Sequence, residues 1–271
     1  MSEGHIHKFF SEGDSQKHFH QVIALHESPE LEWSALSRQM PLLPRGWFEL
    51  SRLGMEDRIE FTQEYWLSQL PLATSENVHL EKGLREFFEN LDEIGIYALQ
   101  SKKDGSFEMH MVYSQKDATG FFQGSPPATE EAIVSLAKRF GQISFPPDYL
   151  AFLRIHDGFS KYTDTGLIKS RDMAQVYQKL QHLLVEEVLV KPDGQLIDPE
   201  NLIPFYESFG LHCYQCFYTD WYPNDEMGNV YFSEQDRSVS NYHDNQMLEE
   251  NLAFSSFLEW LVFYLEDIWQ L

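Results

Sequence analysis

Residues 143–159 constrain the fold more strongly than any other segment, because signals for a helix start, a helix face and a helix stop follow one another there. Pro147 suits the first turn of a helix, where its missing N–H costs nothing, and Asp148 favours the positive helix N-terminus. Asp157 and Gly158 are expected to end the helix, since glycine readily takes the left-handed conformation of a C-cap. The predicted face consists of Tyr149, Phe152, Leu153 and His156. The segment therefore predicts a short helix with one buried face.

The second half of the chain surrounds this helix with further regular elements. Helical periodicity predicts helices over residues 129–140 and 173–184. A closing helix is predicted to begin at Ser256, which stands three residues before Glu259 in capping-box spacing, and its Trp260 is expected to be buried. Strands are predicted at about 202–207, 212–219, 229–233 and 238–243. The sequence therefore predicts an α+β domain in which helices pack on an antiparallel sheet.

These segments resemble, in their order and spacing, the SUKH superfamily. Residues 143–159 are similar to its pattern Leu-Pro-x-x-Tyr-x-x-Phe-Leu followed by Asn-Gly-Gly. Residues 202–206 are similar to its hydrophobic strand that contains Ile-Pro, and residues 228–232 to its Gly-x-Val-Tyr strand. Residues 253–261 are similar to its terminal helix with Ser-Phe-x-x-Trp-Leu. The resemblance covers residues 127–271.

The resemblance carries expectations about fold and function. The superfamily includes fungal regulators of cell-wall glucan synthesis and bacterial immunity proteins that neutralise toxins, so it implies a SUKH-like domain that binds a protein. Three positions depart from its pattern, with Phe145 in place of Leu, Asp157 in place of Asn and Phe159 in place of the second glycine. Residues 1–126 show no such resemblance.

Residues 1–126 are predicted to form a mostly helical region with one β-hairpin. Helices are expected over residues 45–70 and 81–91. Residues 94–100 and 107–113 alternate as strands do, and Asp104 with Gly105 signals the turn between them. The Ser-Pro-Pro-Ala-Thr stretch at 125–129 is the best linker, because two prolines interrupt both helix and strand. The predicted domains are therefore residues 1–126 and residues 127–271.

Residues 1–28 are rich in histidine, which raises the question of a metal site. A solvated N-terminal helix is the favoured interpretation, because no carboxylate or cysteine completes a ligand set there. Weak metal binding by the two His-x-His pairs is the alternative. The histidines concerned are His5, His7, His18, His20 and His26.

The two cysteines, Cys213 and Cys216, exclude a disulfide framework but form a Cys-x-x-Cys pair. Their aromatic surroundings are typical of a strand, whereas a redox pair of this spacing begins a helix. A zinc site needs further ligands, and neither His212 nor His243 has a matching spacing. We therefore expect two structural thiols, with no metal and no cofactor.

The formal net charge of −23 limits the partners of the protein. Such a charge repels phosphates, so we expect no nucleic acid and no anionic membrane, and a basic protein as the partner. Residues 193–271 contain fifteen acidic residues and only Arg237 as a basic one. The first residues lack an apolar signal region, and no apolar run is long enough to span a membrane, so the cytosol is the expected location.

The sequence contains no motif that predicts catalysis, so we expect a non-enzymatic protein-binding module, either a toxin-neutralising immunity protein or a regulatory scaffold. One alternative is a scaffold or effector whose activity lies in residues 1–126. Another is an unrecognised hydrolase that uses Cys216, with His243 as its base, or the acidic turn at residues 220–226. Aromatic side chains commonly anchor interfaces, so the aromatic residues of this acidic turn are candidates for partner contact. The predicted partner-binding residues are Asp220, Trp221, Tyr222, Asp225 and Glu226.

Overall fold

The computed structural model describes most of the chain and divides it into two compact units. The first unit comprises Met1–Ser68 and Arg85–Pro126, and the second comprises Gln69–Leu84 and Pro127–Leu271. The predicted boundary at residue 126 stays a prediction, and the second unit also includes residues that precede it. No helix in the described part is long and apolar enough to cross a membrane. The described residues are 6, 9–10, 19–72, 77–116, 120–141, 143–162, 164–184, 189–190, 194, 196–235, 238–243 and 248–266.

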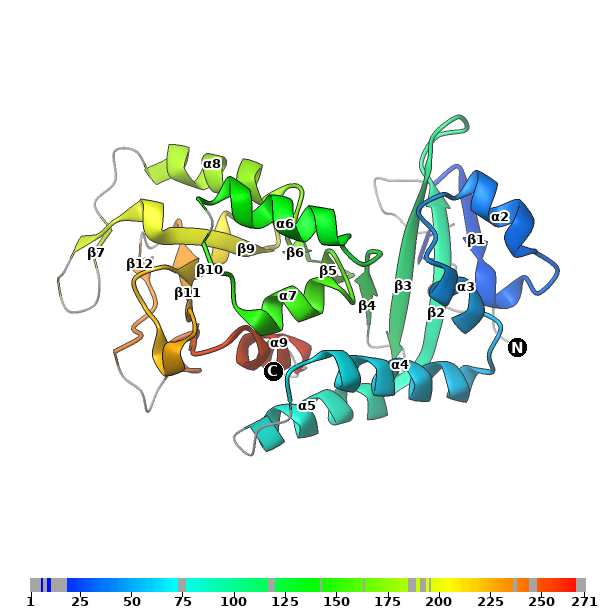
Figure 1. The fold of residues 1–271 in the computed structure, drawn as a ribbon, viewed down its shortest axis with the longest axis horizontal. Coiled ribbons are helices and arrows are strands. Elements are labelled where there is room, and N and C mark those ends of the chain that lie inside the picture. Colours follow the sequence, from blue (N-terminus) through cyan, green and yellow to red (C-terminus); the bar gives the residue numbers. More distant parts are fainter. Residues whose placement is uncertain are drawn as a thin grey trace. The chain divides into compact units, whose positions relative to one another are not determined.

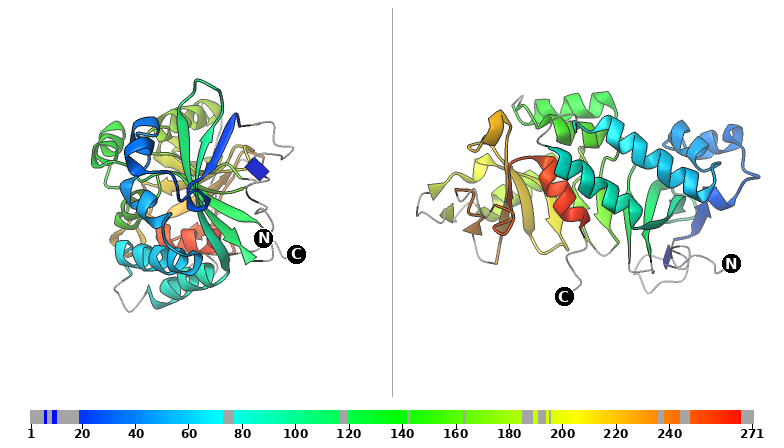
Figure 2. Two further views of the ribbon diagram at one scale, coloured as in Figure 1. Left: turned by 90° about the vertical axis from the view of Figure 1, so that its right-hand side faces the viewer. Right: turned by 90° about the horizontal axis from the view of Figure 1, so that it is seen from below.

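The first unit contains an antiparallel sheet in the order β1-β2-β3-β4 (Figures 1 and 2). The predicted hairpin is confirmed by β2 (Leu91–Gln100) and β3 (Phe107–Gln115), which pair along their whole length. The sequence analysis missed the two outer strands, β1 (Gln21–Ala24) and β4 (Phe121–Gly124). Both outer strands are only four residues long, so their periodicity is too short to recognise.

The helices between residues 33 and 89 differ from the prediction in their number and bounds. The single helix expected over residues 45–70 is two helices, because the chain turns at residues 51–54. Ser51 Oγ donates a hydrogen bond to Phe48 O at 2.7 Å, and Gly54 has little preference for a helix. A short helix that precedes residue 45 was not predicted, and the helix expected over residues 81–91 ends at residue 89. The bounds are α2 (Trp33–Gln39), α3 (Arg45–Leu50), α4 (Met55–Gln69) and α5 (Val78–Glu89).

Residues 6, 9 and 10 are helical, as expected near the N-terminus, but the prediction that this helix is solvated is wrong for Ile6 and Phe10. Ile6 and Phe10 are buried in a hydrophobic cluster of the first unit, and residues Gln21–Ala24 form a strand. The side chain of His26 is only 1% exposed, and its Nδ1 accepts a hydrogen bond from Ile96 N at 3.1 Å. His26 therefore has a structural role, while His5, His7 and His18 lie outside the described residues.

The second unit is built on a larger sheet in the order β6-β9-β10-β11-β12-β7-β8, with β13 also paired to β11. Its neighbouring strands are antiparallel except for β12 and β7. The α+β architecture predicted from the sequence is thus confirmed. The strands of this sheet are β6 (Gly166–Leu167), β7 (Leu189–Val190), β8 (Leu196–Ile197), β9 (Leu202–Ser208), β10 (Cys213–Tyr218), β11 (Asn229–Ser233), β12 (Ser238–Val239) and β13 (Ala253–Phe254). The second unit also contains β5 (Phe159–Lys161), which is not part of this sheet.

Helices cover both faces of this sheet (Figure 1). On one face, α8 (Met173–Leu184) packs on Tyr214, Cys216 and Tyr218 of β10. On the other face, Phe217 of β10 contacts Tyr149 of α7 (Pro147–Leu153) at a ring distance of 4.9 Å. The strands are therefore buried on both sides, which explains why residues of β10 do not alternate between apolar and charged side chains.

The start of α7 is confirmed, but its predicted end is wrong. Pro147 occupies the first turn, and the helix ends at Leu153, not at Asp157 and Gly158. The backbone N–H groups of residues 155 and 156 both donate to Phe152 O, which closes the helix with a tight turn. His156 therefore lies beyond the helix, where it is fully buried. Phe152 and Leu153 are buried as predicted.

Two other helices of the second unit begin at side-chain caps. Thr129 Oγ1 accepts a hydrogen bond from Ala132 N at 3.2 Å and begins α6 (Glu130–Arg139). Ser256 Oγ accepts one from Glu259 N at 3.1 Å and begins α9 (Phe257–Leu265), as predicted. Trp260 on α9 is 3% exposed, which confirms that it is buried.

A buried carboxylate joins α7 to α9. Asp148, which is 3% exposed, accepts hydrogen bonds from Tyr149 N at 2.8 Å and from Leu258 N at 2.9 Å. Each N–H lies in the first turn of a helix, where backbone donors have no partner within the helix. Burial raises the pKa of Asp148 from 3.8 to about 6, although the backbone N–H donors oppose this shift.

The raised pKa of Asp148 predicts how the free energy of unfolding depends on pH. Because the folded state binds the proton more tightly, this group's contribution falls as pH rises from about 4 to 6, by at most about 1.4 kcal/mol per pH unit. The variant Asp148→Asn lacks this titration. Urea unfolding of both proteins at pH 4, 5, 6 and 7 should therefore show the original protein losing stability relative to the variant. A difference that is constant with pH would contradict the prediction.

A second prediction concerns Gly83, which lies in the part of α5 that belongs to the second unit. A Cβ at this position would lie 2.5 Å from Val262 Cγ1 on α9, closer than packed atoms allow. Gly83→Ala should therefore lower the free energy of unfolding by about 1–3 kcal/mol, although alanine favours helix. Gly46→Ala in α3 is the matched control, because a Cβ there meets no atom within 4 Å and should not destabilise. Equal effects of the two substitutions in thermal unfolding would disprove the close approach.

Candidate functional site

The five predicted partner-binding residues lie in one turn, at residues 219–228, between β10 and β11. Backbone hydrogen bonds close this acidic turn from Trp221 N to Tyr218 O and from Gly228 N to Trp221 O, both at 3.0 Å. Asn224 and Asp225 take positive φ angles of 56° and 63°, so the chain reverses sharply there. The backbone hydrogen bonds and the two positive φ angles therefore give the acidic turn a defined conformation.

Its charged side chains point outward. Asp220, Asp225 and Glu226 are exposed, and Tyr222 is 52% exposed. Asp220 Oδ2 accepts a hydrogen bond from Asn201 Nδ2 at 2.8 Å, which fixes its direction. The acidic turn thus brings three carboxylates and one phenol to a single surface.

Trp221 differs from the other four residues, because it packs inward. Its ring lies 5.1 Å from that of Tyr242 and contacts the core of the second unit. A Cβ at Gly228 would lie 2.4 Å from Trp221 Cε3, so the glycine makes room for the indole. Trp221 therefore supports the turn, and Tyr222 is its exposed aromatic residue.

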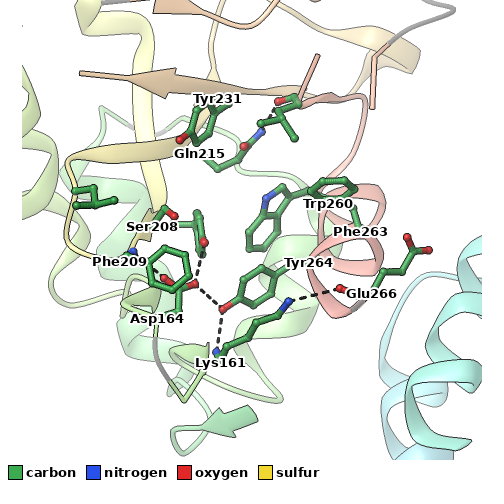
Figure 3. A pocket seen from close by; sticks show the side chains of 13 residues that line it. Lys161, Asp164, Ser208, Phe209, Gln215, Tyr231, Trp260, Phe263, Tyr264 and Glu266 are labelled. Carbon is green, nitrogen blue, oxygen red and sulfur yellow. Dashed lines mark hydrogen bonds between the residues drawn. The ribbon is translucent and has the colours of Figure 1, made fainter. Parts of the chain in front are cut away.

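A pocket of about 480 Å³ opens elsewhere on the second unit, as Figure 3 shows. It gathers residues from β5 and the segment after it, from β9 and the loop after it, from β10 and β11, and from α9. Its walls are largely aromatic, which suits the stacking of flat or apolar groups. The aromatic lining consists of Tyr206, Phe209, Tyr231, Trp260, Phe263 and Tyr264.

The carboxylate of Asp164 organises one wall of the pocket (Figure 3). Its Oδ2 accepts hydrogen bonds from Tyr206 Oη at 2.8 Å and from Tyr264 Oη at 2.9 Å. Its Oδ1 accepts from the backbone N–H groups of Phe209 and Thr165, both at 2.8 Å. Burial and the charge of Asp164 raise the pKa of both phenols well above 10, so both stay protonated as donors.

Gln215 contributes a buried amide whose orientation is fixed. Asn229 Nδ2 donates to Ser256 O at 2.9 Å, so Asn229 Oδ1 faces Gln215 as an acceptor. Leu252 O is a second acceptor beside it. Gln215 must therefore present Nε2 to both, at 2.7 and 3.1 Å, and its Oε1 is left on the other side of the amide.

Trp260 contributes a buried donor to the same pocket. Its indole stacks on Tyr264 at 5.1 Å with an angle of 11° between the rings. The indole nitrogen points into the pocket, below the side chain of Gln215, in Figure 3. Among the described residues, neither Trp260 Nε1 nor Gln215 Oε1 is hydrogen-bonded, and neither atom is sealed from solvent.

Two apolar side chains stand exposed at the rim of the pocket. Phe209 is 45% exposed and Leu211 is 65% exposed, both in the loop between β9 and β10. Phe209 has a φ of 51° and His212 a φ of 56°, conformations that cost a residue other than glycine roughly 1 kcal/mol. The loop therefore holds apolar surface toward solvent in a strained backbone.

The thiols lie in β10, as predicted, and differ in access. Cys216 is fully buried, and burial raises its thiol pKa well above 9, which disfavours the thiolate that a nucleophile requires. Cys213 is partly exposed and its thiol lies 3.7 Å from Leu211 O. Within the described residues, no group of three His, Cys, Asp or Glu side chains could hold a metal ion.

The pocket was not predicted from the sequence. Tyr206 and Trp260 have the hydrophobic spacing of core residues, and Asp164 stands in a loop without a motif. The one available signal for the pocket was Gln215, a polar residue in the middle of an aromatic strand. A buried amide needs hydrogen-bond partners, so such a residue indicates a polar site within the core.

The two thiols give a prediction that is simple to measure. In the folded protein, a thiol reagent such as 5,5′-dithiobis(2-nitrobenzoate) should react with Cys213 and leave Cys216 unmodified, because burial protects Cys216. One equivalent of thiol should therefore react before unfolding, and two should react in guanidinium chloride. Cys213→Ser should abolish the reaction of the folded protein, and rapid reaction of both thiols would contradict the buried position of Cys216.

Comparison with known protein families agrees with the resemblance predicted from the sequence. Residues 127–262 match the SMI1 / KNR4 family (SUKH-1). A comparison with curated proteins found no match. The matched residues hold the helices α6, α7 and α8, the larger sheet, the acidic turn and Trp260, and they make up half of the 271-residue chain. The chain therefore belongs to the SMI1 / KNR4 (SUKH-1) family.

Proposed function

We propose that the chain is a non-enzymatic protein-binding module and that its acidic turn contacts a basic partner. The observation that carries the proposal is the exposure of Asp220, Asp225 and Glu226 in one shaped turn. Carboxylates on one surface repel each other, and a cationic partner relieves that repulsion. Membership of the SUKH-1 family supports a role as a toxin-neutralising immunity protein or as a regulatory scaffold.

The acidic turn and its aromatic residue would act at different stages of binding. The three carboxylates attract a basic surface over several ångströms, which raises the association rate and makes it sensitive to salt. Tyr222 offers an exposed aromatic surface that a partner can cover, which slows dissociation. Trp221 contributes by holding the turn in shape, because it packs against Gly228 and Tyr242.

The test removes the three charges of the acidic turn without changing their size. The partner is obtained by affinity purification with mass spectrometry, and its association with Asp220→Asn, Asp225→Asn, Glu226→Gln protein is measured at low and high salt. The association rate at low salt should fall about tenfold, and its salt dependence should flatten, because the steering field is lost. An unchanged rate and salt dependence would reject the acidic turn as the contact.

A matched control separates the acidic turn from the general charge of the protein. The variant Glu30→Gln, Glu32→Gln, Glu60→Gln also loses three exposed carboxylates, and these lie in the first unit. Its association rate should fall less than that of the acidic-turn variant, because charges at the contact itself steer association most strongly. Equal losses in both variants would indicate an effect of net charge alone.

A further inference from the structure

We propose that the aromatic pocket binds an amide-bearing side chain, Asn or Gln, of an extended segment of a partner protein. The inference rests on the proposed protein-binding function and adds a second contact to it. The acidic turn and the pocket loop lie at opposite ends of β10, so the pocket is a site distinct from the acidic turn.

The pocket presents two polar atoms that match the two hydrogen-bonding groups of a carboxamide. Trp260 Nε1 is a donor and Gln215 Oε1 is an acceptor, and the residues are only 3% and 2% exposed. A carboxamide has one carbonyl and one N–H₂ group, so a single amide can accept from the indole and donate to Gln215. Solvent reaches both atoms in the free protein, so a ligand of the same shape without these groups would bury them unpaired. Sites of this kind discriminate strongly against such ligands.

The charged residues around the pocket favour a neutral ligand. The carboxylate of Asp164 accepts four hydrogen bonds from within the protein, so it is not free to hold a cation. The ammonium of Lys161 lies 5.3 Å from the centre of the Tyr264 ring, and Glu266, with its opposite charge, lines the same edge. A charged side chain would lose its hydration in an aromatic pocket without a dedicated counter-ion. The pocket therefore favours a neutral amide over a carboxylate or an ammonium group.

The rim of the pocket indicates a protein segment as the source of the amide. Phe209 and Leu211 extend the apolar surface beyond the pocket onto its rim, where both are exposed. A free small amide would leave these side chains in water. A peptide that places its amide in the pocket can cover them with an apolar neighbouring residue, and such burial contributes to affinity.

The indole N–H of Trp260 provides a direct signal for the test. In the ¹⁵N-labelled full chain, Trp260→Phe identifies which of the indole signals of the six tryptophans belongs to Trp260. The probes are three acetylated dipeptide methyl esters, Gln-Leu, Glu-Leu and Met-Leu, in which only Gln carries a primary carboxamide and the first side chains are of similar size. Gln-Leu should shift the Trp260 signal and bind about tenfold more tightly than the other two, as expected for one well-made hydrogen bond. Equal binding of Gln-Leu and Met-Leu would overturn the proposal.

A second variant leaves the pocket interior intact. Phe209→Ser with Leu211→Ser changes only the exposed rim, and it should weaken Gln-Leu binding about tenfold in calorimetry, because the apolar contact is lost. An unchanged affinity would overturn the assignment to a peptide. N-acetylglucosamine carries an amide on a sugar that also stacks on aromatic rings, so a shift of the Trp260 signal by this sugar alone would overturn it as well.

The outcome can be separated from that of the proposed function. If the purified partner associates with the protein but the dipeptides do not bind, the pocket proposal fails and the acidic-turn proposal stands. If Gln-Leu binds and the rim variant binds the partner normally, the pocket is not part of the partner interface, and the proposal is overturned. Loss of both partner association and Gln-Leu binding in the rim variant supports the proposal.

Discussion

Two helices of the second unit begin at the same buried carboxylate. Asp148 accepts a hydrogen bond from the first turn of α7 and another from the first turn of α9, which lie 110 residues apart in the chain. Trp260 and Tyr264 follow on α9, so the position of this helix decides where the aromatic walls of the pocket stand. The carboxylate therefore connects the segment that most constrains the fold with the surface on which binding is proposed.

Local signals predicted those parts of the fold that depend on neighbouring residues. Pro147 and Ser256 mark helix starts because a ring or a hydroxyl acts within one turn, and both helices begin there. The end of α7 was missed because Asp157 is used by a distant segment, accepting hydrogen bonds from Ser170 N at 2.6 Å and Ser170 Oγ at 2.9 Å. No pattern within residues 143–159 reveals that pairing.

In the candidate sites too, features formed by neighbouring residues could be predicted, and features that depend on distant residues could not. The acidic turn could be located from the sequence, because its charges and its aromatic residues are contiguous. The inward packing of Trp221 could not, since it depends on the missing Cβ of Gly228. The pocket is assembled from segments far apart in the chain, and the direction of the Gln215 amide is set by Asn229 and Leu252. Only the folded arrangement shows which of its atoms lack partners.

Glu226 of the acidic turn influences whether the buried carboxyl group of Asp148 binds a proton. Burial is the main cause of the raised pKa of Asp148, and the negative charge of Glu226 adds a smaller contribution. A cation that neutralises Glu226 removes this contribution, so the pKa of Asp148 falls and its carboxyl group loses a proton. Association of a basic partner would then be coupled to proton release near pH 6, and by linkage its affinity would increase as the solution becomes less acidic.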